Sequence, residues 1–82
     1  MKDYIATFHT HLAALRSSRT VPKLGAVKVC LSPVPRKLSS SCGTCLRYSA
    51  EEPCISAMDS DVDSIVEVVG EEEYNLVYKA EE

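Results

Sequence analysis

Proline and glycine residues divide this chain into short segments, and this division limits the elements that it can form. Pro22, Gly25, Pro33, Pro53 and Gly70 each stand where a periodic pattern ends. Proline lacks the backbone N–H that a helix or an inner strand needs, and glycine readily takes the left-handed conformation that ends a helix. The 82 residues predict a single domain, near the size at which one core just sustains folding. A homodimer, which would enlarge that core, stays open.

Hydrophobic periodicity between these breaks predicts six elements. In chain order they are a strand at 4–8, a helix that starts after Thr10 and ends near Pro22, strands at 27–31 and 46–48, a helix from 59 or 60 to 69, and a strand at 74–78. Thr10 can cap the first helix by accepting a hydrogen bond from its free N–H groups. The second helix is indicated by apolar residues at helical spacing, namely Val62, Ile65, Val66 and Val69.

This order of elements predicts an α+β, ferredoxin-like βαββαβ fold, with two helices on one face of a four-stranded antiparallel sheet. In that topology the turn before the first helix and the connection between the second and third strands lie at the same end of the sheet. We therefore expect His9, Thr10 and His11 beside Cys42 and Cys45, and the acidic segment 71–73 at that end as well. A helix N-terminus there would favour a thiolate or a bound anion.

The segment 33–47 between the second and third predicted strands concentrates the reactive chemistry of the chain. It delivers two thiols, Cys42 and Cys45, in a basic loop. Because the thiolate is the nucleophile and the metal ligand, nearby cations such as Arg36, Lys37 and Arg47 favour the reactive form. The residues expected to stabilise a thiolate or hold an anion are Arg36, Lys37, Ser41, Gly43 and Thr10.

Three interpretations of these cysteines stay open from the residues alone. Cys42 and Cys45 have the spacing of a redox pair, in which the second thiol resolves a mixed disulfide formed on the first. A weaker alternative is a zinc site built from His9, His11, Cys42 and Cys45. The plainest interpretation makes Cys45 a core-facing strand residue and makes Cys30 and Cys54 small structural fillers. We predict no cofactor.

Charge is distributed unevenly along the chain. Residues 1–47 hold eight lysines and arginines against one aspartate, a net charge of +7, whereas residues 48–82 carry −10. Attraction between the two halves within one fold explains this simply, and a basic face that receives an anionic partner is the alternative. Basic residues are not interleaved with stacking aromatics, which argues against nucleic-acid binding. The motifs of nucleotide-dependent or hydrolytic enzymes are missing from the sequence.

The hydropathy of the chain argues against a membrane protein. No run approaches the roughly 18 apolar residues of a membrane helix, and residues 1–8 lack the apolar core of a secretory signal. We expect a cytoplasmic, reducing location, where four cysteines are free thiols. In a secreted protein the same even number would indicate two disulfides.

Several segments resemble the Putative Se/S carrier protein-like family of small bacterial domains. They are Ala6–Thr10, Leu12–Leu15, and Pro33–Arg36 followed by Ser39–Gly43. The resemblance implies a carrier of sulfur or selenium with Cys42 as the acceptor, which serves as a protein substrate for a donor and an acceptor enzyme and is not itself a stand-alone enzyme. A dithiol redox module and a metal-binding or protein-interaction domain are the competing functions.

Overall fold

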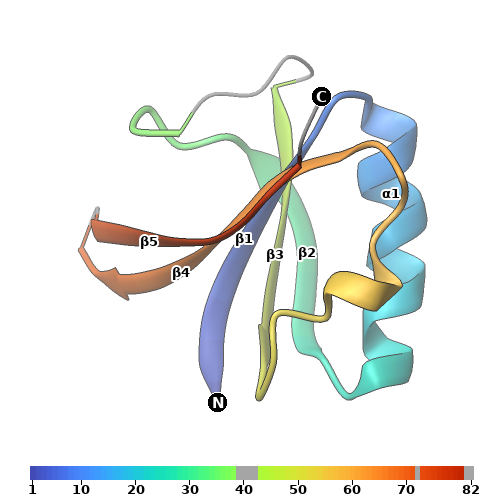
Figure 1. The fold of residues 1–82 in the computed structure, drawn as a ribbon, viewed down its shortest axis with the longest axis horizontal. Coiled ribbons are helices and arrows are strands. Elements are labelled where there is room, and N and C mark those ends of the chain that lie inside the picture. The colour runs from blue at the N-terminus through green and yellow to red at the C-terminus, as the bar shows by residue number, and fades with distance from the viewer. Residues whose placement is uncertain (39–42, 72, 81–82) are drawn as a thin grey trace.

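An antiparallel sheet, in which the strands are not in sequence order, forms the framework of the protein (Figure 1). The computed structural model describes residues 1–38, 43–71 and 73–80, and within them it contains five strands and one α-helix. The elements are β1 (Lys2–Phe8), α1 (His11–Thr20), the short 3-10 helix η1 (Val21–Leu24), β2 (Val27–Pro33), β3 (Thr44–Ala50), the 3-10 helix η2 (Ile55–Ala57), β4 (Val62–Gly70) and β5 (Glu73–Lys79). The strands lie in the order β2-β3-β1-β4-β5, and each neighbouring pair is antiparallel.

The predicted ferredoxin-like fold is wrong, because the segment expected to form a second helix is the strand β4. Five of the nine residues of β4 are valine or isoleucine, whose branched side chains favour strands over helices. A helix would place Ile65 and Val69 on one face. In the sheet Ile65 is fully buried, whereas 53% of Val69 is exposed.

An irregular segment, residues 51–61, takes the place of the missing helix. Figure 1 shows this segment, which contains η2, on the same side of the sheet as α1. The backbone N–H of Asp59 donates to the Ser17 hydroxyl at 2.9 Å, and the Thr20 hydroxyl donates to the carbonyl oxygen of Ala57. These bonds join the segment to α1, so the two together cover one face of the sheet.

The local signals around α1 operate as the sequence predicts. The Thr10 hydroxyl caps the helix by accepting from the N–H of Ala13 at 3.1 Å. The helix ends at Thr20, and Pro22 lies in the 3-10 turn that follows. Gly25 then takes a left-handed conformation, with φ of 94°, which releases the chain into β2.

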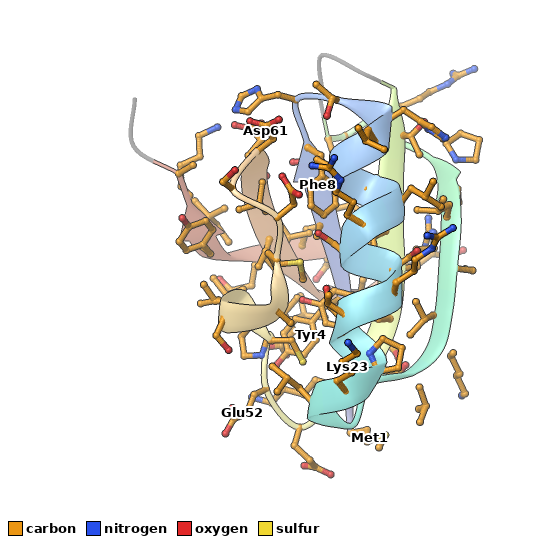
Figure 2. All side chains as sticks on the ribbon, turned by 90° about the vertical axis from the view of Figure 1, so that its right-hand side faces the viewer. Met1, Tyr4, Phe8, Lys23, Glu52 and Asp61 are labelled. Atoms are coloured by element: carbon orange, nitrogen blue, oxygen red, sulfur yellow. The ribbon has the colours of Figure 1, made fainter. Side chains whose placement is uncertain are left out.

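The main core lies between α1 and the sheet. Its largest fully buried apolar side chains are those of Phe8, Val21, Leu46, Tyr48 and Ile65. Figure 2 shows Phe8 near the N-terminal end of α1 and Tyr4 toward its other end. The rings of Tyr4 and Tyr48 stack with centroids 5.4 Å apart, and the Tyr48 hydroxyl donates to the carbonyl oxygen of Pro53.

A second, smaller apolar cluster lies on the opposite face of the sheet. It consists of Ile5, Cys45 and Val66, with Val34 and Leu38 among the residues that pack against it. Figure 1 shows that the chain after β2 turns to this side, away from α1. The second face of the sheet is therefore covered only in part, by a short segment.

The acidic turn between β4 and β5 lies at the other end of the sheet from the position that we expected. The β4 residues Val62 and Glu67 pair with Phe8 and Tyr4 of β1, so the chain reaches Gly70 near the start of β1. Glu71 and Glu73 follow there, while residue 72 lies outside the described residues. The expectation failed because the segment 51–61 returns the chain to the Phe8 end of β1, and residues 62–70 then run antiparallel to β1 toward its start.

Two substitutions in β4 distinguish the strand from the helix that the spacing suggested. We expect Ile65→Ala to lower the free energy of unfolding by about 2–4 kcal/mol, the usual cost of truncating a buried isoleucine. Val69→Ala, on the exposed side of the same strand, should cost less than about 1 kcal/mol. Urea denaturation of both variants measures the difference, and equal large losses would contradict the strand assignment.

Candidate functional site

A row of hydroxyl and thiol groups crosses the face of the sheet that is opposite α1. Register pairs Ser32 with Cys45, Cys45 with Thr7, and Thr7 with Ser64, so the row runs over four strands. The hydroxyls of Thr7 and Ser64 are hydrogen-bonded at 2.7 Å, and the Ser32 hydroxyl lies 3.3 Å from the Cys45 sulfur. This thiol–hydroxyl row includes Cys45 of the 33–47 segment.

Cys45 supplies the thiol of the row, and its side chain has no solvent exposure. Its Sγ lies 3.6 Å from the carbonyl oxygen of Pro33, to which it can donate, and Val34 and Leu38 pack on the same cluster. The core-facing position that the sequence left open for Cys45 is the one that it occupies. A bulky reagent or a protein partner cannot reach this sulfur without movement of the covering segment.

Arg47 and Cys30 occupy the next row on the same face, where they pair across β2 and β3. The Arg47 Nε donates to the Ser32 hydroxyl at 3.0 Å, so one serine connects the guanidinium to the neighbourhood of Cys45. Cys30 is exposed, whereas its neighbours Val29 and Leu31 pack on the main core. Alternation with Val29 and Leu31 along the strand gives Cys30 this orientation. Its exposure does not fit the structural filler of the plainest interpretation.

The turn before α1 lies at the same end of the sheet as the start of β3, as expected. The His11 Nδ1 is 3.3 Å from the Thr44 hydroxyl, and Thr7 pairs with Cys45. The His9 Nε2 lies 3.8 Å from a carboxylate oxygen of Asp63. However, α1 and the Cys45 sulfur are on opposite faces of the sheet. The N-terminal N–H groups of the helix therefore do not act on this sulfur.

The proposed acceptor Cys42 and its neighbour Ser41 lie outside the described residues. Gly43, which follows them, is exposed and left-handed, with φ of 72°. Its carbonyl oxygen accepts from the N–H of Val34 at 3.2 Å, which joins the two ends of the connection between β2 and β3. Arg36 and Lys37 are exposed on this connection.

Cys54 belongs to the main core, on the opposite face of the sheet from Cys45. It is buried, and its thiol donates to the carbonyl oxygen of Glu52 at 3.4 Å. Burial raises the pKa of the Cys54 thiol, and the Glu52 carboxylate raises it further. Both effects favour the neutral thiol, which is a poor nucleophile.

The described residues contain neither a metal-binding cluster nor a membrane-spanning helix. Within residues 1–38, 43–71 and 73–80, no cluster of three or more histidine, cysteine, aspartate or glutamate side chains is arranged to hold a metal ion. In the same residues, no helix combines the length and the apolar character required to cross a membrane.

The three described thiols should differ in their reaction with an alkylating reagent. In the Cys42→Ser variant under native conditions, we expect Cys30 to react and Cys45 and Cys54 to be protected because they are buried. All three should react in denaturant. Peptide mass mapping after a timed pulse identifies the modified residues. Rapid native labelling of Cys45 would contradict its place under the 34–38 segment.

The buried tyrosine hydroxyl predicts a loss of stability at high pH. Burial raises the pKa of Tyr48 above its ordinary value of 10.0. The folded state therefore holds this proton more tightly than the unfolded chain, and stability that is present below pH 10 falls as the pH rises further. We expect Tyr48→Phe to have a smaller free energy of unfolding but a weaker alkaline dependence. Tyr74→Phe serves as the control, and an unchanged alkaline dependence in Tyr48→Phe would contradict the assignment.

Comparison with known proteins identifies the family of this chain. The model of the family described as Putative Se/S carrier protein-like matches residues 3–78, which include α1, β2, β3 and β4 and all but one residue each of β1 and β5. No curated protein and no solved structure matches the chain. Because the family match extends over nearly the whole sequence, from β1 into β5, the chain belongs to the Putative Se/S carrier protein-like family.

Proposed function

We propose that this protein carries a sulfur or selenium atom on the Cys42 thiol and relays it between two partner enzymes. Membership of the family supports the carrier role. The observation that favours Cys42 is the burial of two of the other three cysteines, Cys45 and Cys54. A relayed atom must be reached by a donor and then by an acceptor, so a buried sulfur is poorly suited to this task.

Cys30 is the remaining competitor, since it is exposed on β2 opposite Arg47. Cys42 is preferred because it stands in the basic segment that joins β2 to β3, close in sequence to Arg36 and Lys37. Cations of this kind favour the thiolate and attract an anionic persulfide. A segment that connects two strands is also easier for two different enzymes to reach than a position within a strand.

The transfer step is a thiolate attack on the outer sulfur of a persulfide. The Cys42 thiolate forms a new S–S bond with that sulfur, the S–S bond of the donor breaks, and the donor thiolate leaves. The carrier then holds a persulfide, and no external oxidant or reductant is consumed. Delivery repeats the step with the acceptor as the nucleophile. Selenium follows the same route when the donor holds a selenosulfide.

Cys45 has a different role in this proposal. Its burial excludes it as the first acceptor, and its packing against Ile5 and Val66 makes it a structural residue of the small cluster. A relay that uses a Cys42–Cys45 disulfide would require both thiols. The carrier requires only Cys42, together with a reducing compartment such as the cytoplasm in which the acceptor thiol stays free.

The test is sulfur loading by a low-molecular-weight persulfide, read by intact mass after excess donor is removed. We expect the native chain to gain one sulfur atom that a reducing thiol removes, and Cys42→Ser to lose nearly all of this gain. Cys45→Ser should retain loading once its fold is verified by circular dichroism, and Cys30→Ser is the matched control at an exposed thiol.

Two results would overturn the proposal. Full loading of Cys42→Ser together with loss in Cys30→Ser would transfer the carrier role to β2. Loss of loading in both Cys42→Ser and a correctly folded Cys45→Ser, with a Cys42–Cys45 disulfide in the native chain, would favour the dithiol redox module.

A further inference from the structure

A groove on the face of the sheet opposite α1 has the form of a small-molecule site. It has a volume of about 560 Å³ and lies between the segment at Lys37 and Leu38 and the strands β4 and β5. Figure 1 shows the chain after β2 on this side of the sheet, away from α1. The volume is in the range of about 300–1,000 Å³ that is usual for ligand sites.

The floor and one wall of the groove are apolar. Val66 belongs to the small cluster, and Leu38 and Tyr74 pack against it. Leu76 extends this surface along β5 with 58% of its area exposed. A leucine this exposed, beside three other apolar side chains, leaves an apolar surface that a ligand could cover.

The charged groups of the groove favour an anion. Lys37 and Lys79 line it together with one acidic residue, Asp63. The Lys79 ammonium lies 3.2 Å from an Asp63 carboxylate oxygen. Among the described residues, no ion pair joins Lys37 to a carboxylate. The groove is thus locally positive in a chain whose net charge is −3.

From this geometry we propose that the groove binds a small organic anion with an apolar body, such as an aryl or alkyl carboxylate or sulfonate. The apolar body lies on Val66, Leu76 and Tyr74, and the acidic group is held between Lys37 and Lys79. The Ser64 hydroxyl, which also lines the groove and bonds to Thr7, offers a polar contact at the same end as Lys79. This inference is independent of the role of Cys42.

Two fluorescent probes test the proposal, the anion anilinonaphthalene sulfonate and the neutral phenylnaphthylamine, which shares its rings but lacks the sulfonate. Titrations use the Cys42→Ser chain, so that binding is measured separately from sulfur loading. We expect tighter binding of the anion, and weakening by added salt. Lys37→Gln should lower the affinity for the anionic probe about two- to fivefold, the range for one exposed ionic contact. Its affinity for the neutral probe should be unchanged.

Matched leucine variants locate the apolar part of the site. Leu76→Ala should weaken the binding of both probes. Leu24 is a similarly exposed leucine on η1, and Leu24→Ala should leave the binding of both probes unchanged. On addition of the anionic probe, the amide NMR signals of Leu38, Val66 and Leu76 should shift, and those of α1 should stay constant.

Three outcomes would overturn the proposal. They are equal affinity for the neutral and anionic probes, shifts confined to the α1 side of the sheet, and a Leu76-dependent dimer in sedimentation. The last of these would show that a second copy of the chain covers the groove.

Discussion

The pairing of β1 with both β3 and β4 is the constraint on which the rest of the structure depends. β1 is the central strand, and residues 4–8 are all buried. Since successive side chains of a strand point to opposite faces, a strand in this position needs cover on both sides. α1 and the 51–61 segment cover one face, and residues 34 and 38 cover part of the other. The uncovered remainder, over β4 and β5, is where the groove lies.

The three described thiols differ in environment because the covering segments lie over some of them and not over others. Cys45 lies beneath the covering segment, Cys30 lies on the edge strand β2 in contact with solvent, and Cys54 lies in the main core. A carrier must present one sulfur to its partners and keep the others from competing for it. Burial of Cys45 and Cys54 meets the second requirement, and it makes Cys42 and Cys30 the pair that sulfur loading must distinguish.

Local signals were sufficient where a few adjacent residues decide the conformation. The Thr10 cap, the end of α1 before Pro22, the left-handed Gly25 and the strand before Pro33 all follow from the sequence. The secondary structure of residues 59–69 did not follow from local signals, because the apolar spacing that predicted a helix also fits an irregular strand. The pairing of β4 with β1 skips Asp63, so Val62 and Ile65 both face α1 although an odd number of positions separates them.

Sequence alone determined the family, the short elements that proline and glycine delimit, and the basic segment that contains Cys42 and Cys45. The sequence also predicted the end of the sheet at which His11 lies, because the strand and the helix that flank the turn fix its position. Only the tertiary structure decided that residues 62–70 form a strand, that Cys45 is buried, and that Lys37 and Lys79 flank one groove. The physical reason is range: caps and turns act within a few residues, whereas strand pairing and burial depend on contacts between distant parts of the chain.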